Sequence, residues 1–596
     1  MANSPLSQQG EVLDLTILVD GKEIDSNYAV ISVQVKRAIN KISKAKIVLL
    51  ESQSFDDDFD ANKSDSFVPG KEVEIKAGYD GKSTAIYKGV ITRHRARSQS
   101  GKGVELQLTC SDKAIKMTLG RQNRYFKELK DSDIIKKVIG DSGLSAKVGA
   151  TTYQHPNLVQ YYASDWDFVR MRAEVNGMIV ANRDGELVVD KPAIAGSPVL
   201  KLSYGVDVFS YGMELNSEAQ MVDVKGVAWD GKTQSMIEEA SSEPTVNKQG
   251  NITGKKLAEV LNVSGLQLQS SAPIPKEMLK VWANSELLKA RLSSTHGRLS
   301  CPGSALVFPN TLIELQGFGD RFDGEAYVSK VRHELANGDW ITHIDYGLSS
   351  EWFIKKKANI TAPPASGAIP AIEGLQIGIV KKIEKDPDQT NRVQVDIPVI
   401  DPKGGSVWAR LANFYATNNA GSYFMPEVGD EVVLGFLNND PRFPIILGMV
   451  HSAKNPSPET PDEKNNIKGF ITKNQLKLTF DEERKAIMIE TPGGNKVTLS
   501  DKDSSIALQD SNKNTITMDK SGVSIDSVKD INLKAKGNIK FSADAKITVD
   551  AKADVDVSGL NIKNSAKVAF KAEGQAQAEL SAAGQTTVKG AMVMIN

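Results

Sequence analysis

Pairs of apolar residues recur every eight residues near the C-terminal end of this 596-residue chain. One polar residue separates the two members of each pair, as on one face of a β-strand. The first members lie at 523, 531, 539, 547 and 555. A repeat of this kind predicts one short strand and one turn per unit. The pairs are Val523/Ile525, Ile531/Leu533, Ile539/Phe541, Ile547/Val549 and Val555/Val557.

One such unit cannot stabilise itself. Ordering its eight residues costs on the order of 8–16 kcal/mol of backbone entropy, whereas burying two aliphatic side chains returns about 3–6 kcal/mol. Eight residues span about one face of a triangular prism, so three chains winding together would complete each turn and share one core. At about 4.8 Å per strand layer, some fifteen units would build a needle roughly 70 Å long. We therefore predict an intertwined trimeric β-prism. A single-chain β-helix and a disordered polar tail are the alternatives.

Less regular pairs flank the strict repeat. Those before it step by seven to eleven residues and predict an irregular start of the same structure: Leu476/Leu478, Ile487/Ile489, Val497/Leu499, Ile506/Leu508 and Ile516/Met518. The later pairs Leu560/Ile562 and Val568/Phe570 keep the spacing after a phase shift.

The rest of the chain reads as short strands with few helices. Asp20-Gly21, Asp80-Gly81 and Asn337-Gly338 each stand between alternating β patterns and predict tight hairpin turns. Helical spacing of apolar residues predicts helices over 131–144, 164–177 and 276–292, the second with Ser164 as its N-cap. The predicted fold is mainly β, with β-barrels in the N-terminal half.

Two stretches rich in proline and polar or small residues divide the chain. The predicted organisation is a β-barrel region with helical insertions over 1–358, a linker over 359–374, a compact β unit over 375–452, a second linker over 453–470 and the repeat region over 471–596.

Composition excludes several classes of function. The chain has 73 Lys+Arg against 74 Asp+Glu, a net charge of −1, which removes the electrostatic case for nucleic acid. Its two cysteines cannot form a disulfide framework, and no zinc-ligand spacing occurs. The start has no basic segment followed by an apolar one, and no run of about 18 apolar residues appears. We expect a protein made in the cytoplasm without a signal peptide.

Two catalytic motifs are begun but not completed. The segment GKST at 81–84 would need glycine at 76 to be a phosphate-binding loop, and Lys76 stands there. The segment HELAN at 333–337 has Asn337 where a zinc protease needs its second histidine. We predict no catalytic residue, cofactor or metal. Two functions of other classes are kept as alternatives to a non-catalytic function. One is a spike- or fibre-borne hydrolase acting on cell-wall or capsule glycans, and the other is a passive glycan-binding fibre.

Arg93, Arg95 and Arg97 alternate along one predicted strand and so share a face. A solvated face and a contact with an acidic partner surface explain this pattern equally well.

Three motifs together resemble one family. They are QYYASDWDFVRMRAEVNGM at 160–178, GSYFMPEVGDEV at 421–432 and NDPRFPIILG at 439–448. They resemble the VgrG-type spike proteins of contractile injection systems, a group that includes type VI secretion spikes, extracellular injection particles and phage tail hub–needle fusions. The resemblance covers nearly the whole chain.

The resemblance implies a homotrimer in which residues 1–358 form a tail-hub-like domain and 375–452 an OB-fold collar. Trp408, Phe424, Val432, Leu434 and Phe436 would then belong to the barrel core rather than to a ligand site. The hub would adapt a sixfold inner tube of Hcp-like protein to a threefold needle, beside other baseplate proteins. The needle would puncture a target membrane mechanically and carry tip or effector proteins. A PAAR-type tip protein would cap the C-terminal end, at Met592, Val593, Met594, Ile595 and Asn596.

Overall fold

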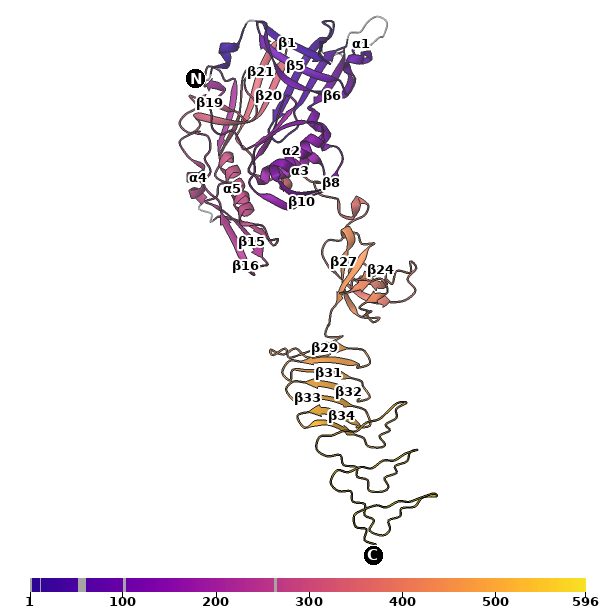
Figure 1. Ribbon diagram of the computed structural model, residues 1–596. Helices are drawn as coiled ribbons and strands as arrows, with labels where there is room; N and C mark the ends of the chain where they lie inside the picture. Colours follow the sequence, from indigo (N-terminus) through magenta and orange to yellow (C-terminus); the bar gives the residue numbers. More distant parts are fainter. Residues whose placement is uncertain (1–2, 11, 52–59, 100–102, 262–264, 596) are drawn as a thin grey trace. The chain divides into compact units, whose positions relative to one another are not determined.

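The computed structural model describes residues 3–10, 12–51, 60–99, 103–261 and 265–595. Its elements fall into two compact units, Met1–Val450 and His451–Asn596 (Figure 1). Strands dominate and helices are few, which confirms the mainly β fold expected from the sequence. Within the described ranges, none of the helices combines the length and apolar character that crossing a membrane requires.

A 13-stranded sheet forms the main body of the first unit. Its strands are β1 (Leu13–Val19), β2 (Lys22–Glu23), β3 (Ala29–Ala38), β4 (Lys44–Leu50), β5 (Glu72–Tyr79), β6 (Lys82–Gln99), β7 (Gly103–Ser111), β13 (Leu200–Ser203), β14 (Ser210–Leu215), β18 (Thr295–Pro302), β19 (Leu312–Gln316), β20 (Gly324–Ala336) and β21 (Asp339–Tyr346). The order is β14-β18-β21-β20-β3-β4-β7-β6-β5-β1-β2, with β19 paired to β20 and β13 paired to β19. The three predicted hairpin turns are confirmed, because Asp20-Gly21, Asp80-Gly81 and Asn337-Gly338 all have the positive φ angles that such turns need.

Two hydrophobic cores share this sheet. The first gathers mainly residues of β1–β7, among them Val33 and Leu106, which are fully buried. The second gathers residues of β13 and β18–β21, among them Leu200 and Ile344. The antiparallel pairing of β3 with β20 joins the two halves into one sheet.

The three predicted helices are present as α2 (Asp131–Asp141), α3 (Asp165–Val175) and α5 (Lys276–Ser293). Ser164 caps α3 as expected, since the backbone N–H of Asp167 donates to its Oγ at 3.1 Å. The smaller elements of this unit are α1 (Asp60–Lys63), β8 (Gln122–Lys130), β9 (Ser145–Val148), β10 (Gln154–Ala163), β11 (Ile179–Arg183), β12 (Glu186–Asp190), β15 (Val224–Asp230), β16 (Ser235–Ala240), α4 (Gly254–Leu261), β17 (Leu266–Ser270) and α6 (Phe353–Lys356).

A closed five-stranded barrel ends the first unit. It consists of β22 (Gln376–Lys382), β23 (Val393–Asp396), β24 (Ser406–Leu411), β27 (Glu431–Phe436) and β28 (Pro444–Met449). Val432 and Leu434 are fully buried in its core and Phe436 packs against them, while Trp408 is only partly buried. The prediction of Phe424 as a core residue is wrong, because its side chain is 50% exposed. Phe424 follows the small hairpin β25 (Ala416–Thr417) and β26 (Ala420–Gly421), outside the barrel strands.

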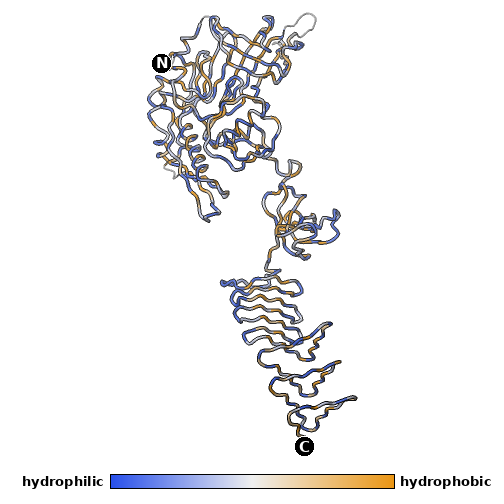
Figure 2. Tube along the Cα trace, viewed as in Figure 1, coloured by the Kyte–Doolittle hydropathy of each residue, from blue (hydrophilic) through white to orange (hydrophobic). Residues whose placement is uncertain are grey.

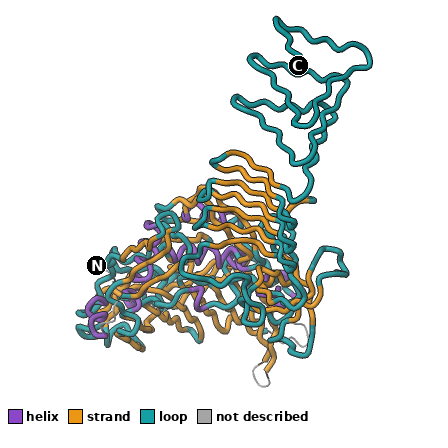
Figure 3. The backbone as a smooth tube through the Cα atoms, turned by 90° about the horizontal axis from the view of Figure 1, so that it is seen from below, coloured by secondary structure: helices purple, strands orange, loops and turns teal. Residues whose placement is uncertain are grey.

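Seven short strands open the second unit, and each pairs antiparallel with the next (Figure 3). They are β29 (Ile467–Ile471), β30 (Lys477–Asp481), β31 (Ala486–Glu490), β32 (Lys496–Ser500), β33 (Ser505–Gln509), β34 (Thr515–Asp519) and β35 (Gly522–Asp526). From 527 to 595 the described backbone forms no strand with its own chain.

Candidate functional site

One face of the β29–β35 sheet carries an apolar surface. Residues directly opposite each other on antiparallel strands point to the same side, so the register shows which side chains share a face. It aligns two columns of apolar residues, which together we call the apolar ladder. One column is Phe470, Leu478, Ile489, Val497, Leu508, Ile516 and Ile525, and the other is Phe480, Ile487, Leu499, Ile506, Met518 and Val523.

The apolar ladder is open to solvent in the single chain. Apart from Leu478 and Val497, which are partly buried, its side chains are 37% to 68% exposed. Figure 2 shows hydrophobic and hydrophilic residues alternating along this part of the chain. The opposite face carries small and polar residues such as Thr498 and Ser500. A continuous exposed apolar face of this length is typical of an interaction surface.

Four of the five predicted pairs before the strict repeat lie on the ladder, and the first does not. Leu476 precedes β30, and its backbone N–H donates to Thr472 Oγ1 at 3.1 Å in the turn. The apolar pair of β30 is instead Leu478 with Phe480. Turn hydrogen bonding, which apolar spacing does not reveal, moves the strand start by two residues.

Beyond β35 the backbone bends at a regular interval. Bends occur at 528–529, 536–537, 544–545, 552–553 and 560, and again at 567–568, 575–576, 583–584 and 591–592, eight residues apart within each series. The tube in Figure 3 makes successive wide turns through this segment. The eight-residue period of the sequence is therefore also a period of the backbone. We call the segment from β35 to 595 the shaft.

Two of the ten predicted shaft-core residues lie on β35 and eight lie between these bends, and all ten are 50% to 75% exposed in the single chain. Their burial in a shared core remains a prediction, but the chain alone does not cover them. They are Val523, Ile525, Ile531, Leu533, Ile539, Phe541, Ile547, Val549, Val555 and Val557.

The phase shift after Val557 differs from the one expected. Leu560 and Val568 coincide with bends and are 99% exposed, whereas the first members of the strict repeat do not coincide with bends. Ile562 and Phe570 stand between bends and are less exposed. A single seven-residue step, from Val555 to Ile562, restores the period of eight through Phe570.

The predicted tip residues Met592, Val593, Met594 and Ile595 are exposed at the end of the described chain. Asn596 lies outside the described residues. Their contact with a tip protein remains a prediction.

The three arginines of β6 are exposed on one face of that strand, as predicted. Arg93, Arg95 and Arg97 stand opposite Thr109, Gln107 and Glu105 of β7. In the part of the chain that the structure describes, no ion pair involves these arginines.

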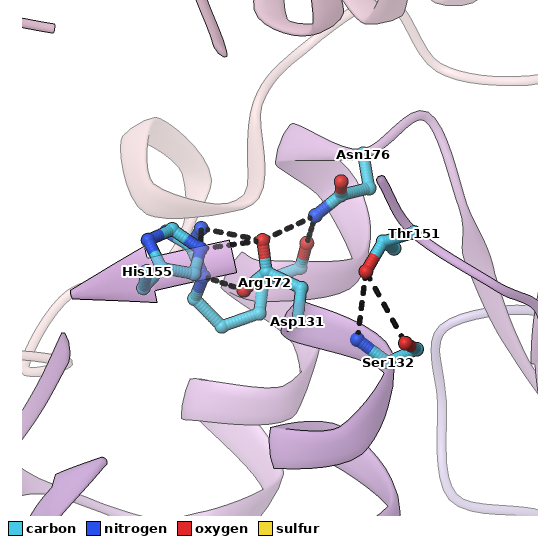
Figure 4. Close-up of polar contacts among 6 residues, drawn as sticks. All are labelled: Asp131, Ser132, Thr151, His155, Arg172 and Asn176. Carbon is cyan, nitrogen blue, oxygen red and sulfur yellow. Dashed lines mark hydrogen bonds and ion pairs between the residues drawn. The ribbon is translucent and has the colours of Figure 1, made fainter. Parts of the chain in front are cut away.

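A buried cluster in the first unit connects α2, α3 and β10 (Figure 4). Arg172 donates to both oxygens of Asp131, from Nε at 2.6 Å and from Nη2 at 2.9 Å. His155 Nε2 lies 3.0 Å from Oδ2 of Asp131, and Asn176 Nδ2 donates to the same oxygen at 2.9 Å. Burial raises the pKa of Asp131, but these partners outweigh it and leave that pKa below its ordinary 3.8.

This cluster acts as a structural joint, because Arg172 and Asn176 connect α3 to α2 and His155 connects β10 to α2. Neighbouring Ser132 and Thr151 bond to each other rather than to the carboxylate, with Ser132 N–H donating to Thr151 Oγ1 at 3.0 Å. Sequence reasoning missed the cluster, since the partners of Asp131 lie 24, 41 and 45 residues away.

Three families match successive parts of the chain. Residues 9–337 match the family described as Alg8 N-terminal domain. Residues 376–451 match the type VI secretion system/phage-baseplate injector OB domain, and residues 486–596 match the phage baseplate V C-terminal trimerisation domain.

Curated relatives share a short segment with this chain. The spike protein VgrG3 of Vibrio cholerae is 35% identical over 115 residues, and VgrG1c of Pseudomonas aeruginosa is 35% identical over 103 residues. These segments cover 18% and 16% of this chain and only 11% and 14% of the two relatives.

Solved structures resemble the chain over longer stretches at low identity. A chain of the Francisella PdpA–VgrG complex has a TM-score of 0.39 at 10% identity, with 87% of this chain and 80% of that chain covered. The Escherichia coli type VI secretion protein c3393 has a TM-score of 0.35 at 14% identity, with 73% and 99% covered.

The first family match spans more than half of the chain, and the other two account for the barrel and for the region of the exposed ladder and shaft. The chain therefore belongs to the Alg8 N-terminal domain family and is a spike protein of the VgrG/phage baseplate V type, with an injector OB domain and a C-terminal trimerisation domain.

Proposed function

We propose that three copies of this chain form the spike of a contractile injection system. The observation that carries the proposal is the apolar ladder and its continuation along the shaft. Thirteen ladder residues share one face of a sheet, and eight further shaft-core positions follow with a bend every eight residues. Three copies that share one core would cover these side chains, which suits a domain matched as a trimerisation domain.

The domain organisation proposed for the spike follows the predicted ranges. Residues 1–358 would be the hub, 375–452 the OB collar and 471–596 the needle, with linkers between them. The hub would adapt a sixfold tube of Hcp-like protein to the threefold needle and would contact baseplate proteins. A PAAR-type protein would bind at 592–596, and effectors would be carried without covalent linkage. The protein would be made in the cytoplasm and delivered with the particle.

The proposed action is mechanical. In a shaft of three intertwined chains, backbone groups pair between strands and few sheet edges are left free, which favours rigidity along the axis. Contraction of a sheath would drive this shaft through a target membrane, with no catalytic step by this chain. The second class of function, hydrolysis of cell-wall or capsule glycans, would need converging carboxylates. The buried carboxylate of Asp131 is instead held by Arg172, His155 and Asn176.

The test is to locate the chain in assembled particles. A full-length chain with an N-terminal tag would be expressed in its native host, and contractile particles would be purified and labelled with gold against the tag. We expect label at one end of the inner tube only. Label along the whole tube, or particles free of the chain, would contradict the spike proposal. Release of soluble sugars from purified cell wall by the isolated chain would favour the hydrolase.

A further inference from the structure

Charged residues of alternating sign recur at eight-residue spacing along the shaft. Lys536, Asp544 and Lys552 each occupy the first residue of a bend. Two more pairs with this spacing also have opposite signs, Asp526/Lys534 and Lys546/Asp554. Between 523 and 558 no two like charges stand eight residues apart.

Within the described shaft, these charged side chains have no ion-pair partner in their own chain. All seven side chains are exposed. Across the described residues of the shaft, the structure records no ion pair for any of them, whereas Lys571 further along pairs with Glu573. Their spacing therefore calls for partners outside the single chain.

Threefold symmetry supplies such partners. If each eight-residue unit covers one face of a triangular shaft, one copy moves to the next face with every unit. A face that holds a given unit of one copy then holds the following unit of the neighbouring copy one layer further along. Adjacent layers lie about 4.8 Å apart. Residues i and i+8 of two different copies are then stacked neighbours, while in one copy they lie on different faces.

We propose that the shaft is joined by a ladder of ion pairs between copies, running from Asp526 to Asp554, with the partner of each charge supplied by the neighbouring copy of this chain. The inference rests on the proposed trimeric spike. At the corner position, Lys536 of one copy faces Asp544 of the next, and Asp544 faces Lys552. Each contact occurs three times around the axis, so weak surface pairs add up along the shaft.

The proposed ladder of ion pairs ends at a defined place in the sequence. After the seven-residue step that leads to Ile562, Lys563 and Lys571 are like charges eight residues apart. Lys571 is already paired with Glu573 of its own chain. The proposal is therefore confined to the part of the shaft before the step.

The test compares two substitutions that change the charge of the full-length chain equally. Asp544→Lys places three lysines in the corner column, at 536, 544 and 552. Asp550→Lys is the matched control, because Ser542 and Ser558 stand at its i±8 positions. We expect Asp544→Lys to speed dissociation of the trimer about tenfold or more at low salt, measured by subunit exchange, against less than threefold for Asp550→Lys. At about 1 M salt the difference should disappear, since the screening length there is about 3 Å.

A rescue makes the assignment specific. The triple variant Lys536→Asp/Asp544→Lys/Lys552→Asp restores alternation in the corner column and should restore slow dissociation. Equal dissociation rates of Asp544→Lys and Asp550→Lys in a trimeric protein would overturn the ladder of ion pairs. The proposal that the chain is a spike would still stand. A wild-type chain that is not trimeric would overturn both.

Cysteine cross-linking tests the stacking without relying on charge. Ala543→Cys/Ala551→Cys puts thiols at i and i+8, where neighbouring copies should bring the Cα atoms to about 4.8 Å, within the range of a disulfide. Mild oxidation should give a covalent trimer on non-reducing gels, because the native Cys110 and Cys301 are buried. Ala543→Cys/Ala553→Cys is the control and should stay largely uncrosslinked. Equal cross-linking of the two would contradict the stacking.

Discussion

The first unit and the shaft handle their apolar side chains in opposite ways. In the first unit, large apolar residues such as Val33, Leu106 and Ile344 are fully buried by their own chain. In the second unit, among the residues that the structure describes, Ala486 is the only buried hydrophobic residue, and all ladder and shaft-core positions except the partly buried Leu478 and Val497 are exposed. The comparison teaches that the first unit is stabilised within one chain and the shaft between chains. Only the stability of the shaft should therefore depend on protein concentration.

The largest expected effect comes from a charge in the predicted shaft core. Ile547→Asp would place three carboxylates in the shared core, so we expect loss of the trimer at micromolar concentration. The melting transition of the first unit should stay within about 1 °C, because Ile547 is not part of its cores. Sedimentation and differential scanning calorimetry on the same sample measure the two responses. A trimer that survives this substitution would show that the shaft core is elsewhere.

The reverse experiment breaks the first unit. Asp131→Ala leaves Arg172 and His155 without their carboxylate, and we expect a loss of about 3–5 kcal/mol in the free energy of unfolding. Urea unfolding followed by tryptophan fluorescence measures it, with Asp133→Ala on the same helix as the matched control. The shaft trimer should keep its dissociation rate. Equal effects of the two alanine variants would contradict the role of the cluster as a joint.

The stability of the two regions should also respond differently to acid. Burial, with Arg37 and His343 nearby, lowers the pKa of His333 from 6.5 to about 3, so the folded chain keeps this imidazole neutral. Between pH 6.5 and 3 the unfolded state binds the extra proton, and stability of the first unit falls as pH falls. At pH 5 the loss is about 2 kcal/mol relative to pH 7.

His333→Gln should flatten this dependence when unfolding is measured across pH 5–7. The shaft should show no such window, because no histidine follows His451 in the sequence. An unchanged pH profile in the variant would contradict the assignment to His333.

The smallest effect concerns one helix cap. Ser164→Ala removes the acceptor for the N–H of Asp167 at the start of α3 and should cost about 1 kcal/mol of first-unit stability. Ser164→Asp should restore most of it, since aspartate also caps helices well. Thermal unfolding of the three proteins distinguishes the outcomes, and equal melting of wild type and Ser164→Ala would show that the cap is dispensable.

Local signals predicted the local features of the fold well. Neighbouring residues in the sequence encode each of these features: the Asp-Gly and Asn-Gly turns, the Ser164 cap and the bends that recur every eight residues. Two shifts in position were not predicted. Leu476 is held in a turn by Thr472, and Leu560 coincides with a bend, and neither is visible in apolar spacing.

Features that depend on distant residues were also missed. The cross-strand columns of the apolar ladder require the register of seven strands, which pair spacing alone does not set. The Asp131 cluster gathers side chains from α2, α3 and β10. Phe424 has the large apolar side chain of a typical core residue, but it follows a hairpin that lies outside the barrel strands.

The native mass of the full-length chain tests the central claim most directly. Light scattering on the purified protein, at several concentrations, reports whether the exposed apolar residues of the shaft are covered by other copies. The account predicts a species of about 194 kDa, three times the 64.6 kDa chain, that persists on dilution. A folded monomer of 64.6 kDa at every concentration would contradict it.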